Sequence, residues 1–289
     1  MSIDRLQSQI RKLKNPSIVT FCLDKNYVPS GYLEQYGALT DAYCAYAKDL
    51  LNALKDVLPA VRFAFGTFSL CGANGIKILQ ELLLLASKLG YYVLLDMPEI
   101  TSSQEAELAA DAVCGNADWK FDGLTVPCYI GSDALKPFLR YMENNDKDIV
   151  LMLRTANKSA QELQDLLTGS RLVYTAAADI AKRVGQPFIG RSGYSRVAGF
   201  GPATSADSLQ GLRSKYPELF LFVDGYDYPG ANAKNCSSAF DKLGHGAAAC
   251  AGESILAAWK VDAVADCLNA AVSAAERMKK NLTRYITIL

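Results

Sequence analysis

Acidic side chains stand directly after, or a few residues beyond, strand-like apolar runs along this chain. These acids are Asp24, Asp96, Glu99, Asp224, Asp227 and Glu253. Carboxylates that converge can hold a divalent cation or hydroxyl groups. They can also raise one another's pKa, which produces a general base. The pattern therefore predicts an acidic site, provided that the fold brings the ends of these runs together.

Eight such runs alternate with helical patterns along nearly the whole chain. The runs cover residues 18–24, 61–65, 91–96, 121–127, 148–154, 197–201, 219–224 and 245–252. The helical patterns include residues 39–55, 75–88, 132–141, 160–167, 172–184, 206–215 and 261–280. This alternation predicts an α/β fold, a single (β/α)8 TIM barrel over residues 1–289, with an open doubly wound sheet as the alternative. In a barrel the carboxyl ends of the strands meet at one mouth, where active sites lie.

The composition excludes several classes of protein. Thirty basic residues balance thirty acidic ones, so no net field favours nucleic acid or an anionic membrane. No apolar run reaches membrane-spanning length, and the first residues lack the order of a signal peptide. The eight cysteines are scattered without a C-x-x-C pair, and His245 is the only histidine. We therefore expect a cytoplasmic protein with reduced thiols and no structural zinc, and we expect His245 to lie away from the mouth.

Several segments, taken in order, resemble the orotidine 5′-phosphate decarboxylase family in its longer bacterial branch. They are Cys22-Leu23-Asp24, Val61-Arg62, Gly72–Gly75, Asp122–Val126, Tyr129–Phe138, Leu153–Asn157 with Leu163-Gln164, and Gly199–Thr204. The resemblance spans about residues 18–258. It implies a TIM barrel of pyrimidine nucleotide biosynthesis, a carbon–carbon lyase that forms UMP by decarboxylation without a cofactor or metal. It also implies a homodimer that pairs through the surface around the barrel mouth.

The resemblance also implies which residues form the site. The catalytic positions fall on Arg62, Asp96 and Glu99. Positions that contact a small-molecule ligand, a nucleotide in this family, fall on Asp24, Lys25, Thr125, Arg154, Asn157, Asp224 and Glu253.

The two lysines of the family pattern are missing. The family carries Asp-x-Lys-x-x-Asp after the third strand, where an ammonium stabilises the carbanion and delivers the proton. Asp96 matches the first acid, but Pro98 stands at the lysine and Glu99 is the best match for the last acid. Arg62 replaces the lysine of the second strand, and arginine does not give up a proton near neutral pH.

The phosphate-binding pattern has changed as well. Pro229 stands where the resemblance implies a glutamine, and Glu253 stands where it implies an arginine. An arginine binds phosphate through two parallel hydrogen bonds, whereas a glutamate repels the dianion. Arg191 and Arg196, in a loop that contains glycine, could supply a replacement anion site.

Three hypotheses follow from these departures. The chain could be a degenerate homologue that no longer decarboxylates orotidylate and acts as a binding or regulatory pseudoenzyme. It could be an enzyme with new chemistry at the acidic mouth. It could also remain an orotidylate decarboxylase, with Lys25 as a displaced lysine.

Overall fold

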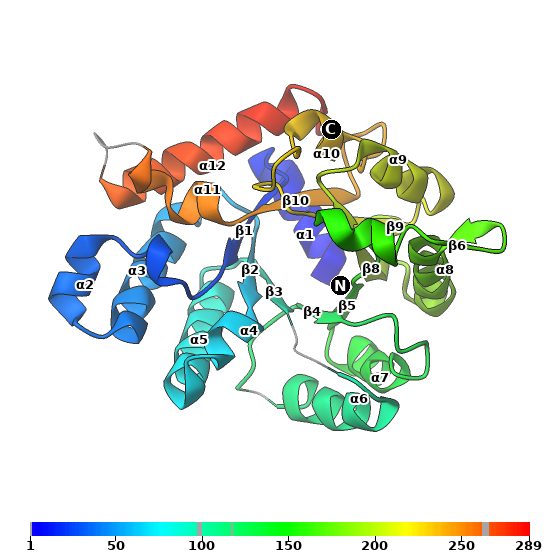
Figure 1. Ribbon diagram of the computed structural model, residues 1–289, viewed down its shortest axis with the longest axis horizontal. Helices are drawn as coiled ribbons and strands as arrows, with labels where there is room; N and C mark the ends of the chain where they lie inside the picture. The colour runs from blue at the N-terminus through cyan, green and yellow to red at the C-terminus, as the bar shows by residue number, and fades with distance from the viewer. Residues whose placement is uncertain (1, 97–99, 117, 262–265) are drawn as a thin grey trace.

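Eight parallel strands close into a barrel, which confirms the predicted TIM barrel and rules out the open sheet (Figure 1). The computed structural model describes residues 2–96, 100–116, 118–261 and 266–289. The barrel strands are β1 (Ser17–Phe21), β2 (Ala60–Ala64), β3 (Tyr92–Asp96), β4 (Gly123–Val126), β5 (Asp148–Leu151), β8 (Ser195–Pro202), β9 (Leu219–Asp224) and β10 (Ala247–Ala251). They are hydrogen-bonded in the order β1-β10-β9-β8-β5-β4-β3-β2. Nearly every strand residue is buried, as a sheet covered on its outer face by helices requires.

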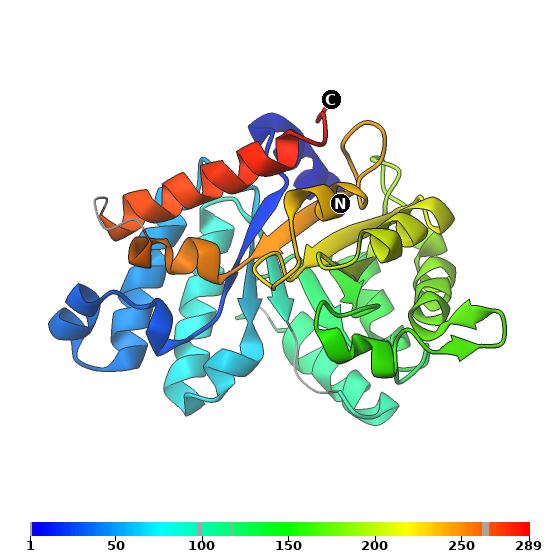
Figure 2. The same ribbon diagram turned by 45° about the horizontal axis from the view of Figure 1, so that its top comes forward.

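The helices form an outer layer around the strands (Figures 1 and 2). The longer ones are α1 (Ser2–Leu13), α3 (Leu39–Leu54), α5 (Gly72–Lys88), α7 (Lys136–Asn144), α8 (Val173–Gly185), α9 (Ala206–Lys215) and α12 (Cys267–Thr283). Shorter α-helices are α2 (Ser30–Tyr36), α4 (Phe65–Ser69), α6 (Ser103–Ala109), α10 (Ala233–Ser237) and α11 (Glu253–Leu256). Single-turn segments are η1 (Lys25–Tyr27), η2 (Ala110–Cys114), η3 (Lys158–Glu162), η4 (Gln186–Phe188) and η5 (Ala258–Lys260).

The helix predicted over residues 160–167 is wrong. Only the single turn η3 forms there, and it is followed by an antiparallel hairpin of β6 (Leu167–Thr168) and β7 (Arg171–Leu172). Gly169 adopts φ +65° in the two-residue turn, a conformation that glycine reaches without steric strain. The hairpin projects from the barrel at the right of both views. The closing helix also differs: it begins at Cys267, where the carboxylate of Asp266 accepts hydrogen bonds from two backbone N–H groups.

The first helix, α1, covers the amino-terminal end of the barrel and was not predicted. Its apolar face, Ile3, Leu6 and Ile10, is fully buried. Its polar side chains hold the loops that lead into the strands. Gln7 accepts a hydrogen bond from the N–H of Gly246 at 3.0 Å, just before β10. His245 lies at this same end, with Nε2 2.9 Å from the carbonyl oxygen of Leu289, so its predicted place away from the mouth is confirmed.

Two further expectations concern chain-wide features. All eight cysteines are free thiols. Within the described ranges, none of the helices combines the length and the hydrophobicity that a bilayer crossing needs.

A buried ion pair lies inside the barrel near its amino-terminal end. Arg196 donates from Nε to Asp148 at 3.0 Å, and the hydroxyl of Tyr92 donates to the same carboxylate at 3.0 Å. Burial raises the pKa of Asp148 to about 7, although Arg196 and Tyr92 act in the opposite direction. Asp148 is fully buried, so its titration is coupled to folding.

We predict that Asp148 makes the protein less stable as the pH rises. The folded-state pKa lies above the usual value of 3.8, so the native state binds this proton more tightly than the unfolded chain. Its stabilising contribution is present at acid pH and is lost as the pH rises through about 7. The free energy of unfolding, measured with urea, should fall by about 2–3 kcal/mol between pH 5 and pH 8 from this group. Asp148→Asn should lack that part of the slope; equal slopes in both proteins would contradict the prediction.

Candidate functional site

An arginine inside the barrel mouth bridges two carboxylates from different strands. Arg62 of β2 donates from Nε and Nη2 to Oδ2 of Asp96, each at 2.8 Å, and from Nη1 to Oδ1 of Asp224 at 2.5 Å. Thr125 of β4 donates its hydroxyl to the other oxygen of Asp96 at 2.6 Å. The guanidinium also lies over the ring of Phe200, 4.5 Å from its centroid. Arg62 therefore joins β2 to β3, β8 and β9, and Asp96 adds a link to β4.

The strand register places these side chains on one face. Asp96 is paired with Ala64 of β2 and with Thr125 of β4, so the third strand ends level with its neighbours. Arg62 lies two residues before Ala64 and so points to the same face as that position, into the barrel. A long side chain at that depth reaches up to the carboxylates at the rim. The prediction that strand-end acids converge is therefore confirmed for Asp96 and Asp224.

Arg62 is held in its charged form. Its side chain is 8% exposed, against 20% for Asp96 and 26% for Asp224. Burial alone would lower the pKa of the guanidinium, but the charges of Asp224 and Asp96 outweigh burial and raise that pKa well above its ordinary value. The group is a fixed cation that cannot serve as a proton donor.

A cavity of about 340 Å³ opens above this ion pair. It is lined by Thr20, Cys22, Tyr27, Arg62, Ala64, Asp96, Asp224, Gly225, Tyr226, Asp227, Tyr228, Cys250, Ala251, Gly252 and Glu253. We call it the mouth cavity. Its volume is suited to a small molecule. Among the described residues that line it, four are acids and one, Arg62, is basic, so the mouth cavity carries an excess of negative charge.

The carboxylate of Asp227 accepts hydrogen bonds from backbone N–H groups that follow the last barrel strand. Asp227 accepts a hydrogen bond from the N–H of Gly252 at 2.6 Å and a longer one from the N–H of Ser254 at 3.4 Å. In TIM barrels the loops after the seventh and eighth strands and the start of a short helix often bind phosphate. Those elements here are the loops after β9 and β10 and the helix α11. The carboxylate of Asp227 therefore satisfies donors of the kind that a phosphate would use.

The thiols and the phenol of Tyr27 at the mouth cavity are protonated near neutral pH. Burial raises the pKa of Cys22 to about 11 and also raises the pKa of Cys250. Burial raises the pKa of Tyr27 to about 12, and the charges of Glu253 and Asp227 act in the same direction. Thiols in this state are poor nucleophiles. The cavity wall therefore offers neutral hydroxyl and thiol groups beside fixed carboxylates.

Arg154 and Asn157, predicted as ligand contacts, line a neighbouring cavity of about 480 Å³. Tyr228 lines both cavities and stands between them. Arg154 donates from Nε and Nη2 to the two oxygens of Asp165, at 2.7 and 2.8 Å. The guanidinium of Arg154 is thus already bound by an acid of its own loop. Asn157 accepts a hydrogen bond from the hydroxyl of Thr155 at 2.5 Å.

The structure does not bring every predicted site residue into the mouth cavity. Asp24 accepts a hydrogen bond from the N–H of Asn26 at 2.8 Å and caps η1, and the adjacent Lys25 is exposed. Neither is among the described residues that line the mouth cavity. Glu99 and Pro98 lie outside the described residues.

The replacement anion site at Arg191 and Arg196 is wrong. Arg196 is buried at the amino-terminal end of the barrel, where it pairs with Asp148. The N–H of Arg191 donates to Asp4 of α1 at 3.1 Å, at the same end. Both residues precede the carboxyl end of β8, so the barrel itself separates them from the mouth.

Sequence reasoning missed several residues of the mouth cavity. Thr20 pairs with Arg62 in the register of β1 and β2 and so lies on the inner face. Tyr27, Tyr226 and Tyr228 come from loops after the strands. The alternation of inner and outer positions along β1 could have identified Thr20 once Arg62 was known to point inward. The loop tyrosines carry no comparable periodic signal.

The described residues contain no group of three or more histidine, cysteine, aspartate or glutamate side chains arranged to hold a metal ion. Two of the four acids that line the mouth cavity are already bound to Arg62, and a third to backbone N–H groups. A site of converging oxygen ligands for a hard cation would need these groups to be free.

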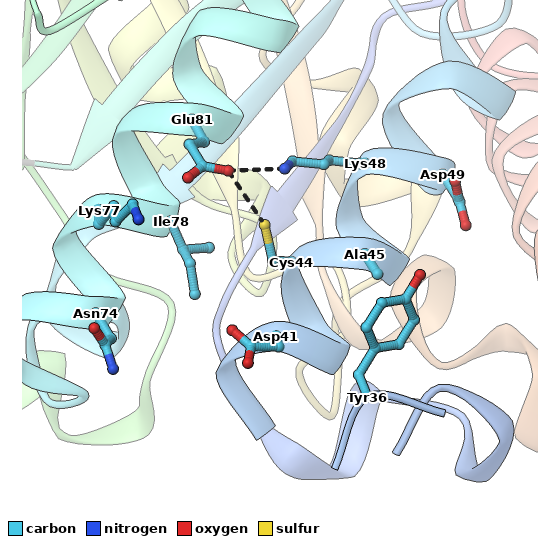
Figure 3. Close-up of a pocket in the computed structure, with 10 residues that line it drawn as sticks. All are labelled: Tyr36, Asp41, Cys44, Ala45, Lys48, Asp49, Asn74, Lys77, Ile78 and Glu81. Atoms are coloured by element: carbon cyan, nitrogen blue, oxygen red, sulfur yellow. Dashed lines mark hydrogen bonds and ion pairs between the residues drawn. The ribbon is translucent and has the colours of Figure 1, made fainter. Parts of the chain in front are cut away.

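A separate groove of about 480 Å³ lies on the outer face between α3 and α5, away from the strand ends. Figure 3 shows the carboxylate of Glu81 on α5 facing Lys48 and Cys44 of α3. Its carboxylate accepts a hydrogen bond from Lys48 at 2.8 Å and lies 3.8 Å from the sulfur of Cys44. Lys48 and Glu81 thus form an ion pair that joins the two helices, and none of the described residues that line this groove also lines the mouth cavity.

The closed barrel and the polar cavity at its carboxyl end define a TIM barrel with a cavity where such barrels carry their sites. No family model matches the chain. An orotidine 5′-phosphate decarboxylase of Clostridium novyi (strain NT) is 26% identical over 259 residues, which make up 89% of each protein. That of Clostridium botulinum (strain Loch Maree / Type A3) is 27% identical over 261 residues, 90% of each. The chain is thus a homologue of orotidine 5′-phosphate decarboxylases, as its motifs predicted.

The solved structures agree in fold. The orotidine 5′-monophosphate decarboxylase of Plasmodium berghei aligns with a TM-score of 0.80 over 99% of each chain, at 13% sequence identity. Likeness at this level of identity shows the shared barrel alone.

We predict that Arg62→Met strongly destabilises the protein. The change leaves Asp96 and Asp224 close together at the mouth without their counter-charge, and breaking a buried pair typically costs about 3–5 kcal/mol. The free energy of unfolding, measured by urea denaturation, should fall by that amount. Neutralising both acids in the triple variant Arg62→Met, Asp96→Asn, Asp224→Asn should recover most of it.

A matched control is Arg171→Met, because Arg171 pairs with Asp179 through a side chain that is 53% exposed. An exposed pair contributes at most about 1 kcal/mol. If Arg62→Met cost no more than this control, the bridging role of Arg62 would be refuted.

Proposed function

We propose that this chain is a homologue of orotidine 5′-phosphate decarboxylase that no longer decarboxylates orotidylate, and that it acts as a small-molecule-binding pseudoenzyme. Its ancestry is in pyrimidine nucleotide biosynthesis. The observation that carries the proposal is Arg62, whose guanidinium is fixed between Asp96 and Asp224. The decarboxylation leaves a carbanion that must receive a proton, and the only cation among the described residues of the mouth cavity cannot supply one.

A second line of support concerns the phosphate. Orotidylate binds as a dianion, and backbone N–H groups and an arginine are the donors suited to it. Here Asp227 accepts from the backbone N–H groups of Gly252 and Ser254, and Glu253 begins the helix that follows. Two carboxylates therefore stand where the anion would need donors. This arrangement favours a ligand without a phosphate group over a nucleotide.

The hypothesis of a displaced lysine has less support. Lys25 belongs to η1 at the end of β1, and its side chain is exposed. The described residues that line the mouth cavity include no lysine. New chemistry at the acidic mouth stays a second candidate, favoured by the excess of carboxylates there. The thiols of the cavity are protonated, and Asp96 and Asp224 are bound to Arg62. Glu253 is therefore the carboxylate most available to act as a base in such chemistry.

The remaining parts of the proposal follow from ancestry. We propose that residues 1–289 act as one barrel domain and that two copies pair through the surface around the mouth. We also propose that the protein works in the cytoplasm, without a cofactor. These statements rest on the resemblance to the family.

We predict that the protein does not bind UMP, the product of the decarboxylase reaction, below millimolar concentration. Isothermal titration calorimetry at about 0.15 M salt is the measurement. The double variant Asp227→Gly, Glu253→Arg removes two negative charges and adds one positive charge at the backbone donors. It should bind UMP at least tenfold more tightly than the unmodified protein, because a charge-assisted hydrogen bond adds about 1.5–3 kcal/mol.

The control is Glu107→Arg, an exposed position on α6, which should leave UMP binding unchanged. Micromolar binding of UMP by the unmodified protein would contradict the proposal, since it would mean that the acids at the mouth do not exclude the anion.

A further inference from the structure

The mouth cavity combines three features that select one class of ligand. The first is its charge: four carboxylates and one guanidinium belong to its described lining. Arg62 forms ion pairs with both Asp96 and Asp224, and Asp227 accepts hydrogen bonds from backbone N–H groups. Glu253 makes no such pairing and is exposed at the rim. A cation entering the cavity therefore meets a carboxylate that has no competing positive partner in the cavity.

The second feature is an unpartnered polar atom in the wall. Thr20 lines the mouth cavity and is 9% exposed. Its Oγ1 is buried and makes no hydrogen bond within the structure. Buried hydroxyl groups nearly always have a partner, so Oγ1 of Thr20 can accept a hydrogen bond from a water or a ligand beside it. A hydroxyl can accept a hydrogen bond from an N–H donor of a ligand.

The third feature is aromatic. Tyr27, Tyr226 and Tyr228 all line the cavity, on loops after β1 and β9. Burial keeps Tyr27 protonated, so its ring carries no charge of its own. Neutral tyrosine rings attract organic cations through their faces and pack against apolar or aromatic bodies. A phosphate or carboxylate ligand gains no such attraction from the ring faces.

From these three features we propose that the mouth cavity binds a small organic ammonium ion with an apolar or aromatic body. The ammonium group donates hydrogen bonds to Glu253 and to Oγ1 of Thr20, and the body lies against the tyrosines. This inference rests on the proposed function, because it requires that the cavity no longer accepts a nucleotide. An inorganic cation is a poorer match, because the acids that would have to converge on it are already bound.

The test uses three probes of nearly the same shape and different charge. They are tyramine, a cation; 4-hydroxyphenylethanol, which is neutral; and 4-hydroxyphenylacetate, an anion. Isothermal titration calorimetry on the full chain at about 0.15 M salt measures the dissociation constant of each. We expect tyramine to bind at least tenfold more tightly than the neutral probe and the anion to give no measurable heat. Equal binding of the cation and the neutral probe, or no binding of tyramine at millimolar concentration, would overturn the inference.

Two variants assign the contacts. Glu253→Gln keeps the shape of an exposed side chain and removes its charge, and it should weaken tyramine binding about fivefold, the effect of an exposed ion pair. Thr20→Val keeps the volume and removes the hydroxyl, and it should weaken tyramine binding by a similar factor while leaving the neutral probe less affected. Glu107→Gln on α6 should change neither constant. Unchanged tyramine binding in both mouth variants would place the probe elsewhere and reject the assigned site.

The two proposals fail in different ways. If UMP bound tightly to the unmodified protein, the proposed function would be contradicted whatever tyramine does. If UMP and tyramine both failed to bind, the loss of the nucleotide site would stand and the ammonium site would be rejected.

Discussion

The bridge from Arg62 to Asp96 and Asp224 is the constraint on which the mouth of this barrel depends. Three charged groups on three strands are largely removed from water, and each is tolerable only because the others are present. The bridge fixes the rim of the barrel and uses the carboxylates that the strand ends would otherwise offer to a substrate. The same interaction thus stabilises the fold and limits its chemistry. A proton-transferring amine is absent from the described wall of the cavity, and a permanent cation stands in the middle.

Further carboxylates around this bridge engage groups that would suit an anion. Asp227 binds backbone donors that suit an anion, and Glu253 adds a second negative charge beside them. Arg154, which could contact an anion from the neighbouring cavity, has both ends of its fork on Asp165. Each of these acids belongs to the chain itself, so the positive groups and donors at the mouth are satisfied internally. The proposed preference for an uncharged or cationic ligand rests on that internal pairing.

Much of the fold could be predicted from the sequence because strands buried on both faces read as unbroken apolar runs. Asp96 and Asp224 were located correctly, since an acid that ends such a run must lie at the barrel rim. The helix at residues 160–167 was mispredicted because Leu163, Leu166 and Leu167 have helical spacing, whereas Gly169 turns the chain into a hairpin. The apolar face of α1 follows the same periodicity and could have been recognised.

The site was less predictable than the fold, for a physical reason. The partners of Asp227 are backbone N–H groups 25 and 27 residues away, and no side-chain motif records them. The guanidinium of Arg154 is bound by Asp165, eleven residues later in the chain. The loop between them brings the two together, and the sequence does not reveal its path. Arg196 lies at the amino-terminal end of the barrel because it is near the start of β8, a strand of eight residues whose bounds the sequence did not define. These contacts are decided by how the barrel folds in three dimensions, which the order of residues does not show.

The measurement that tests this account most directly is an orotidylate turnover assay on the purified chain, followed by the change in ultraviolet absorbance as the pyrimidine loses its carboxylate. An active decarboxylase measured in parallel shows that the assay works. We predict no change in absorbance above the rate without protein, at any pH at which the protein is folded. Turnover that is abolished by Asp96→Ala would contradict the account, because it would show that the mouth still carries out the reaction with Arg62 in place.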